Sequence, residues 1–315
     1  MNAAASDNRN WLTRSAAIAS ITVAVFLIAL KTWATMETGS TAMLGSLADS
    51  SLDLIASLAT LVGVWIASMP ADDDHRFGHG KAEALAAMFQ VMLIALSASG
   101  IAFRAVNKLF AGDRVTAAPE GMAVSVIAIL ATLLLLAWQR YVMARTRSVA
   151  IGADHVHYQS DLLLNLAVIA ALALDQYAGF TRADPLFGIA IAGWLLWGAW
   201  NAAGEAIDHL MDKEWPEDRR DAFLEVLAKH PDIRGVHDLR TRTSGADDFV
   251  QFHMAVDPHL TITAVHDLMD DVEERIAQDF PGVEVLIHPD PMGLVNEEGT
   301  AAEELLPEAA KGVAP

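Results

Sequence analysis

The chain contains no cysteine, and its 21 Lys and Arg are far outnumbered by 40 Asp and Glu. Without cysteine it forms neither a disulfide nor a thiolate metal site, so any bound metal must use nitrogen and oxygen ligands, which suit Zn²⁺, Fe²⁺ or Mn²⁺ better than Cu⁺. The acidic balance argues against a nucleic-acid partner. The hydrolase motifs H-E-x-x-H and G-x-S-x-G are also missing, which argues against an intramembrane metallohydrolase.

Apolar residues, in contrast, are abundant. They make up 53% of a chain whose net charge is −19, so apolar and charged residues must occupy different regions. Long apolar stretches fill the first two thirds, and the last third is polar and acidic. We predict a cytoplasmic N-terminal segment (residues 1–11), a transmembrane domain (12–210), a soluble domain (211–292) and a disordered acidic tail (293–315).

The transmembrane domain is predicted to be a six-helix α bundle, because six apolar stretches reach the roughly 20 residues needed to cross a bilayer. These stretches are residues 12–33, 41–68, 84–110, 120–143, 153–178 and 185–209. Basic residues are in excess on the side that holds both termini, which places the termini in the cytoplasm. In a bacterium the membrane would be the inner membrane.

Two pairs of polar residues interrupt the second and fifth stretches, namely Asp49 and Asp53, and His157 and Asp161. At four-residue spacing the members of a pair lie on one helix face. Counting residues from the predicted boundaries puts both pairs very roughly 6–20 Å below a membrane surface, near the middle of the bilayer. A charge there costs about 3 kcal/mol even on lenient scales. Three carboxylates and an imidazole at one level would suit a divalent cation.

The alternative for these four residues is a set of interhelical hydrogen bonds without metal. Matched pairs at a similar depth favour the metal site over that alternative. Asp154 and His155 lie next to the second pair, but we expect them on other helix faces or nearer the cytoplasmic end. We therefore leave them out of the predicted ligand set.

A second candidate cluster lies between the second and third stretches. Asp72, His75 and His79 provide one carboxylate and two imidazoles within eight residues, and Gly78 and Gly80 let the loop fold around an ion. An ordinary solvated loop is the alternative at this position.

The soluble domain is predicted to have the order αββαβ, with helices at 217–230 and 262–280 and strands at 233–243, 248–257 and 283–289. In the second strand alternate residues Val250, Phe252, Met254 and Val256 face one side, and His253 faces the other. The domain also holds His237, His266, His288 and Asp290. Spacing alone does not assemble these residues into a site, and ordinary surface histidines are the alternative.

Four motifs in order, SLADSSLD, PADDDHRFGHGKAEALAA, HYQSDLLLN and HDLRTRTSG, resemble the cation diffusion facilitator family, in particular its bacterial zinc and iron efflux members. The resemblance covers residues 12–292. It implies a ferredoxin-like, metallochaperone-like soluble domain and a homodimer in the lipid bilayer. It also implies roles for the following residues: Asp49, Asp53, His157 and Asp161 as the transport site; Asp72, His75 and His79 as a loop site; His237, His253, His266, His288 and Asp290 as a binuclear zinc site; and Lys81 and Asp212 as a charge pair near the dimer interface.

The expected function is efflux of a divalent metal ion from the cytoplasm in exchange for protons, by alternating access. An imidazole among carboxylates favours Zn²⁺, with Fe²⁺ and Cd²⁺ as further candidates, and Zn²⁺ would also serve as a structural or regulatory ion. His157 is the group expected to exchange protons near neutral pH. The alternative is a non-transporting membrane metal sensor or scaffold that uses the soluble domain. Such a protein would not need the carboxylates inside the membrane.

Overall fold

The computed structural model describes residues 3–38, 41–111, 119–178, 180, 182–292 and 305–306. The chain folds into two compact units. One unit, Asn8–Asp208, is helical, and the other consists of His209–Pro315 together with Met1–Asp7 and contains a β-sheet.

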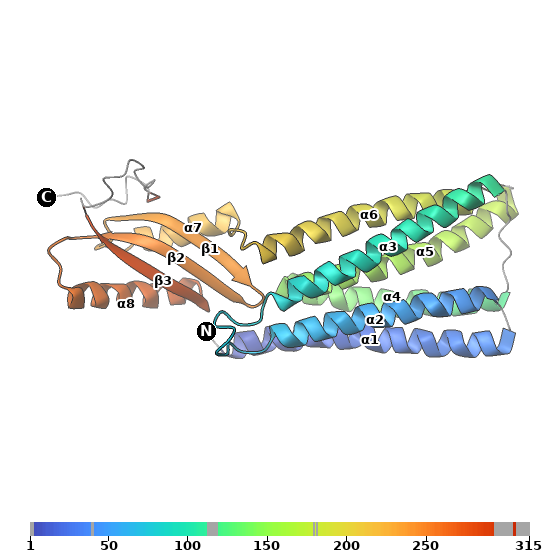
Figure 1. Ribbon diagram of the computed structural model, residues 1–315, viewed down its shortest axis with the longest axis horizontal. Helices are drawn as coiled ribbons and strands as arrows, with labels where there is room; N and C mark the ends of the chain where they lie inside the picture. The colour runs from blue at the N-terminus through green and yellow to red at the C-terminus, as the bar shows by residue number, and fades with distance from the viewer. Residues whose placement is uncertain are drawn as a thin grey trace. The chain divides into compact units, whose positions relative to one another are not determined.

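The helical unit contains six long helices, drawn from blue to yellow in Figure 1. They are α1 (Ala3–Thr38), α2 (Thr41–Ala67), α3 (Ala82–Ala111), α4 (Pro119–Thr146), α5 (Val149–Ala178) and α6 (Ala183–Leu210). Within the described ranges, five of them contain an apolar segment long enough to cross a membrane: α1, α2, α3, α4 and α6. Helix α5 is as long, with 30 residues, but polar side chains such as Asp154 and Asp161 interrupt its apolar sequence. With α5 as the sixth span, the predicted fold class is confirmed.

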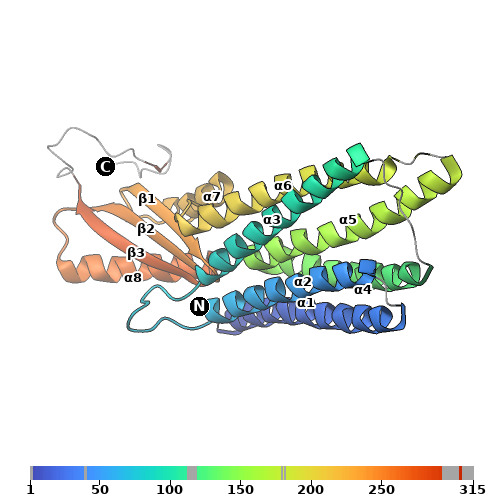
Figure 2. The same cartoon turned by 45° about the vertical axis from the view of Figure 1, so that its right-hand side comes forward.

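Small residues bring these helices close together. Helix α3 packs against α2 and α5, and α5 packs against α4; Figure 2 shows the same bundle from a second direction. Gly63 of α2 lies so close to α3 that a Cβ atom there would meet the Cβ of Ala86 at 2.3 Å. In a bilayer the helices satisfy their own backbone hydrogen bonds, so side-chain packing of this kind decides how they associate.

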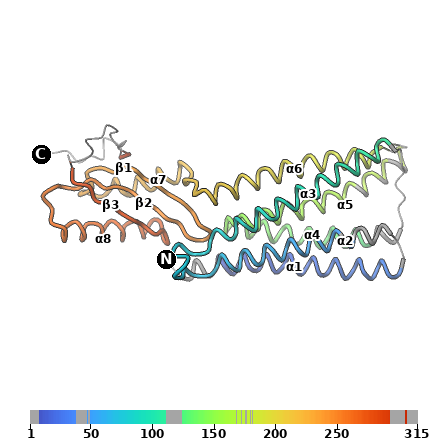
Figure 3. The backbone as a smooth tube through the Cα atoms, viewed as in Figure 1, coloured from blue at the N-terminus to red at the C-terminus, as the bar shows by residue number. Residues whose placement is uncertain are grey.

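The other unit contains α7 (Glu217–Ala228), β1 (Gly235–Ser244), β2 (Asp247–Val256), α8 (Ile262–Asp279) and β3 (Val283–Pro291), traced as a tube in Figure 3. The strand order is β1-β2-β3; β1 pairs with β2 antiparallel, and β2 pairs with β3 parallel. Thr261 caps α8, because its hydroxyl accepts a hydrogen bond from the Ala264 amide. The predicted αββαβ order is confirmed.

One hydrophobic core joins the sheet to α7 and α8. Phe223 of α7, Phe252 and Met254 of β2, and Val272 and Ile276 of α8 are all buried in it. The predicted alternation in β2 is confirmed, because the side chains at positions 250, 252, 254 and 256 are at most 3% exposed, whereas His253 is only partly buried. The histidine side chains lie on the other face of the sheet.

The acidic tail differs from the predicted disordered segment at two residues. The amide of Leu305 donates to the carbonyl of Val236 in β1 at 2.9 Å, and Leu306 is 4% exposed within the core of the C-terminal unit. The buried side chain of Leu306 and the backbone hydrogen bond of Leu305 hold this point of an otherwise Glu- and Ala-rich sequence. The rest of residues 293–315 lies outside the described ranges.

Candidate metal sites

Helices α2 and α5 bring three of the four predicted intramembrane ligands together. Nε2 of His157 lies 2.9 Å from Oδ1 of Asp53, and both side chains are buried. Ligand atoms of Asp53, His157 and Asp161 all lie within 4.8 Å of one another. The group offers two carboxylates and one imidazole, which is a donor set for a divalent cation.

Asp49, the fourth predicted ligand, lies one turn before Asp53 on α2 and is exposed. It is outside the group of three. Between the two aspartates, Ser50 accepts a hydrogen bond from Nζ of Lys31 of α1 at 2.6 Å. Lys31 therefore places a positive charge beside this part of α2, which the sequence pattern did not indicate.

A buried tyrosine fixes α5 beside these ligands. The hydroxyl of Tyr158, next to His157 in sequence, donates to the carbonyl of Ser20 at 3.0 Å and lies 2.9 Å from the hydroxyl of Ser57. Its contacts tie α5 to α1 and α2 at the level of the ligands. Supporting contacts of this kind hold ligand side chains in position. Tyr158 could not be identified from its sequence position, because a tyrosine in an apolar helix usually serves packing.

Asp154 and His155 are outside the group of three. Asp154 is nevertheless completely buried and is bonded to Ser20, Gln90 and Gln139. The two glutamines and the serine were not singled out from the sequence. Single polar residues on three different apolar helices cannot be recognised as partners until it is known that they lie at the same depth in the bundle.

The loop between α2 and α3 forms the second group. Asp72 Oδ1 accepts hydrogen bonds from the amides of His75 at 2.6 Å and Asp74 at 3.0 Å. Nδ1 of His75 lies 3.1 Å from the same oxygen, and Nε2 of His79 lies 3.4 Å from Asp72 Oδ2. The three predicted loop residues thus converge within 4.8 Å.

Backbone groups of the loop also set the charge state of Asp72 and the orientation of His79. The backbone hydrogen bond from His75 holds the pKa of the Asp72 carboxyl below its ordinary value, so the carboxylate stays ionised. Nδ1 of His79 lies 3.2 Å from the carbonyl of Pro70, and as the donor in that bond it leaves Nε2 free to bind a metal. Such a loop can bind a divalent ion at the surface.

In the C-terminal unit three histidines stand directly opposite one another across the sheet. His237 of β1 is paired with His253 of β2, and His253 is paired with His288 of β3. Oδ2 of Asp290 lies 3.1 Å from Nε2 of His237 and 2.8 Å from Nδ1 of His253, and Oδ1 lies 3.3 Å from Nε2 of His288. Ligand atoms of His237, His253 and Asp290 all lie within 4.8 Å of one another. Four of the five predicted residues are therefore neighbours.

The fifth residue, His266 of α8, is exposed; its Nδ1 lies 3.8 Å from Asp270, and it is outside the group. Asp238 lies nearer, with its Oδ2 3.7 Å from Nε2 of His253. A shift of register after His237 and the left-handed backbone of Asp238, with φ of 49°, turn this carboxylate toward the histidines. A bulge cannot be located from strand periodicity, so the sequence reasoning missed it.

Charge also sets the state of Asp290. Partial burial raises the pKa of its carboxyl, but the hydrogen bond with His253 and the nearby imidazoles outweigh burial, so the pKa lies below the ordinary value. An ionised carboxylate among three imidazoles is suited to a divalent cation.

Of the predicted charge pair, Asp212 has an oxygen 3.7 Å from Arg242, and Lys81 precedes α3. Their pairing with each other remains a prediction.

Both parts of the chain match known families. Residues 17–211 match the cation efflux transmembrane domain, and residues 215–292 match the cytoplasmic domain of cation efflux proteins. The cation-efflux pump FieF of Serratia proteamaculans (strain 568) is 43% identical over 286 residues, which are 91% of this chain and 95% of the relative. FieF of Escherichia coli (strain K12 / DH10B) is 40% identical over 288 residues, 91% of this chain and 96% of the relative.

Two solved structures of CzrB, one of them a Zn form, match a part of the chain. The Zn form is 31% identical and covers 27% of this chain and 98% of its own, with a TM-score of 0.26. The other form is 32% identical and covers 25% of this chain and 99% of its own, with a TM-score of 0.24. Scores this low carry no argument about the fold.

Proposed function

The chain belongs to the cation efflux family, the cation diffusion facilitators, and from this premise we propose that it exports Zn²⁺ from the cytoplasm in exchange for protons. It is a multi-pass membrane cation efflux transporter and not an enzyme. The choice of metal, the exchange for protons and the residues that carry the ion are the proposed parts. The single observation that carries them is the contact of His157 with Asp53 between two membrane helices.

The buried group on α2 and α5 is the proposed transport site. Asp53, His157 and Asp161 supply it, and Asp49, one turn away, is the proposed fourth ligand that joins when an ion binds. Four ligands of this kind fit the tetrahedral shell of Zn²⁺. The imidazole favours Zn²⁺, Fe²⁺ or Cd²⁺ over Mn²⁺ and Mg²⁺, which prefer oxygen ligands only.

Exchange for protons follows from the same ligands. A metal ion binds ionised carboxylates and a neutral imidazole, so binding releases protons and protonation releases the ion. We place metal binding on the cytoplasmic side and metal release on the outer side, with a change in helix packing between them. His157 and the carboxylates then return carrying protons.

The two outer groups are proposed as regulatory sites. The loop group of Asp72, His75 and His79 and the sheet group around Asp290 each combine a carboxylate with imidazoles in solvent reach. We propose that Zn²⁺ in the sheet group biases the packing of a homodimer, which is a linkage between two sites. The family model that matches residues 215–292 is named for a dimer domain, which supports the dimer.

The topology proposed for the transporter puts both termini and the C-terminal domain in the cytoplasm, with the bundle in the bacterial inner membrane. The basic residues at the predicted cytoplasmic helix ends support this orientation. A cysteine placed at residue 2 or 310 of this cysteine-free chain should react with an impermeant thiol reagent only after the membrane is opened.

Flux through liposomes tests the transport proposal. Purified protein reconstituted in vesicles should move Zn²⁺ inward or outward with opposite proton flow, read from a metal dye and a pH dye on opposite sides. Asp53→Ala should reduce the Zn²⁺ flux by at least about a hundredfold, since it removes a charged ligand of a buried site. Ser51→Ala, on the same helix and exposed, is the matched control and should transport normally.

Retained flux in Asp53→Ala would overturn the site assignment. Zn²⁺ binding without flux in the wild-type protein would favour a metal sensor or scaffold instead. Flux of Zn²⁺ without a pH change inside the vesicles would support Zn²⁺ transport but refute its exchange for protons.

A further inference from the structure

We propose that Asp154 of α5 is a positioning residue that raises the affinity of the transport site for divalent cations through its fixed negative charge, without binding the cation. The inference rests on the proposed function and deepens it. Asp154 lies three residues before His157 on the same helix, about 4.5 Å along the helix axis, and is outside the ligand group.

Asp154 is the centre of a buried cluster to which five helices each contribute one residue. Its carboxylate accepts hydrogen bonds from the Ser20 hydroxyl of α1 at 2.6 Å, Gln90 Nε2 of α3 at 2.7 Å and Gln139 Nε2 of α4 at 2.8 Å. Gln90 also donates to the Thr60 hydroxyl of α2 at 3.1 Å. All five side chains belong to residues that are 0% exposed. The carboxylate is therefore removed from solvent and held in one position.

The hydrogen bonds around His155 show which form of Asp154 fits this cluster. Gln159 Nε2 lies 3.0 Å from His155 Nε2, and His155 Nδ1 lies 3.1 Å from Gln139 Oε1. An amide nitrogen only donates, so His155 Nε2 accepts and its Nδ1 donates to the Gln139 oxygen. Gln139 then presents its N–H group to Asp154. Three donors aimed at one carboxyl suit its ionised form, which only accepts.

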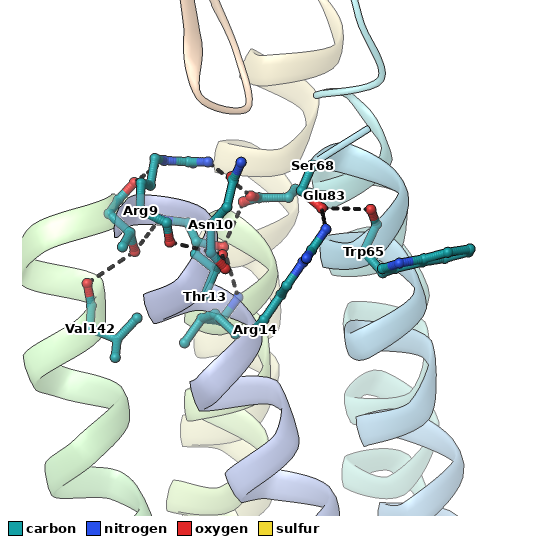
Figure 4. A network of polar contacts seen from close by, with 11 residues as sticks. Arg9, Asn10, Thr13, Arg14, Trp65, Ser68, Glu83 and Val142 are labelled. Atoms are coloured by element: carbon teal, nitrogen blue, oxygen red, sulfur yellow. Dashed lines mark hydrogen bonds and ion pairs between the residues drawn. The ribbon is translucent and has the colours of Figure 1, made fainter. Parts of the chain in front are cut away.

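Another buried carboxylate of the bundle has different partners. Glu83, at the start of α3, is also nearly fully buried, but it forms an ion pair with Arg9 at 3.3 Å and accepts a hydrogen bond from Ser148. Figure 4 shows this network, in which Arg9 also bonds the end of α4 and Arg14 bonds Ser68 of the loop after α2. The charge of Glu83 is thus matched by a cation of the protein.

Asp154 has only neutral donors. Among the described residues no Lys or Arg forms an ion pair with its carboxylate, and its bonds come from two amides and one hydroxyl. A buried charge without an opposite charge is costly. A divalent ion held by Asp53, His157 and Asp161, within one helical turn, supplies that opposite charge. The ion carries two positive charges and a protonated His157 carries one, so the bound ion offsets this cost more than the proton does. The charge of Asp154 therefore adds to the ion's affinity.

A charge that does not touch the ion has a different effect from that of a ligand. Coulomb attraction depends on the charge of the ion and not on its preferred geometry, so all divalent ions should gain the same factor. At a separation below about 10 Å and an effective dielectric constant of about 20 to 50, that factor is at least about tenfold for a divalent ion. Removing a ligand, in contrast, changes the ratio between ions that prefer different ligand sets.

The test is Zn²⁺ and Cd²⁺ transport by the full-length protein in liposomes, with KM and the maximal rate measured for Asp154→Asn. We expect KM to rise at least about tenfold for both ions, with maximal rates within about twofold of wild type. Ser20→Ala, which removes one donor and keeps the charge, is the matched control and should leave KM within about twofold. Gln90→Lys keeps Asp154 but gives it a cation, and should raise KM as Asp154→Asn does.

The proposal is overturned if Asp154→Asn and Gln90→Lys leave KM unchanged. It is also overturned if Ser20→Ala raises KM as much as they do, or if the Zn²⁺ to Cd²⁺ ratio changes as it would for a ligand. If neither charge variant yields folded protein, Asp154 serves only the stability of the bundle, and the proposal is overturned as well. A wild-type protein without flux would instead refute the proposed function, so the two failures are distinguishable.

Discussion

At the scale of single residues, the three candidate metal groups share one arrangement, in which a carboxylate oxygen lies 2.8 to 3.4 Å from imidazole nitrogens. Asp53 faces His157, Asp72 faces His79, and Asp290 faces His253. A proton shared in such a contact occupies the place that a metal ion would take. Ion binding at each group should therefore release protons.

The loop group gives a pH-dependent prediction. The pKa of Asp72 is lowered by the His75 amide, so its charge is present above about pH 4 and is lost only as the pH falls through that lowered pKa. Between pH 7.5 and 5.5 the carboxylate contributes equally. Asp72→Asn should therefore weaken Zn²⁺ binding to the loop by the same factor, about tenfold, at both pH values.

Calorimetric titration of protein carrying Asp53→Ala and Asp290→Ala isolates the loop for this measurement. Asp73→Asn is the matched control, because the Asp73 carboxylate is 98% exposed and points into solvent. If the tenfold difference vanishes at pH 5.5, Asp72 titrates in that range, and the lowered pKa is wrong.

Spacing in the sequence identified the pairs of residues on one helix face, but not all their partners. Asp53 and Asp161 were identified because a carboxylate in an apolar helix is unusual in itself. Gln90 and Gln139 carry no charge and stand singly on their helices, so only the packed structure brings them to Asp154. Asp238 depends on a bulge, which leaves no periodic signal.

At the scale of elements, the contact of α2 with α3 fixes the position of the helix that carries Asp53. Gly63→Ala would place a Cβ 2.3 Å from the Cβ of Ala86, so the two helices must move apart. We expect a loss of about 1–3 kcal/mol in stability, since overpacking exceeds the small gain in helix propensity. Thermal unfolding in detergent and Zn²⁺ flux would both fall.

Gly100→Ala is the matched control for this change, because a Cβ at Gly100 in α3 meets no atom within 4 Å. It should be neutral or slightly stabilising. Equal behaviour of the two alanine variants would argue against a close α2–α3 contact as the feature that holds α2.

Apolar runs and strand alternation predicted several element boundaries closely, but not those of the first helix, predicted for residues 12–33 and observed at Ala3–Thr38. The helix predicted for residues 41–68 is observed at Thr41–Ala67, and the strand predicted for 248–257 at Asp247–Val256. The neighbours of each helix did not follow, because apolar side chains on every face of a membrane helix leave no stripe that marks its partner.

At the scale of the whole molecule, composition predicts an apolar region followed by an acidic one. The family matches cover residues 17–211 and 215–292, and the chain folds into two compact units, Asn8–Asp208 and His209–Pro315 with Met1–Asp7. The tail was the part least open to prediction. Its mean hydropathy is low, and that average does not show two adjacent leucines, one of which belongs to the core of the C-terminal unit.

This contact predicts a role for the tail in stability. Leu306→Ala should destabilise the C-terminal unit by about 2 kcal/mol, the low end for truncating a buried leucine. Amide hydrogen exchange of residues 235–244 in the full-length protein should become faster. Leu305→Ala is the control, because its contact with Val236 uses the backbone amide and survives the change. Unchanged exchange in Leu306→Ala would show that the tail contributes nothing to the unit.

The row of histidines across the sheet links the identity of the ligands to the alignment of the strands. His237, His253 and His288 stand opposite one another only in the observed register, and in β2 His253 alternates with core residues such as Phe252. A slip of one residue in β2 would turn His253 into the core and Phe252 into water. A metal ion bound by these histidines would then stabilise the native strand register over a shifted one, because only correctly aligned strands bring its ligands together.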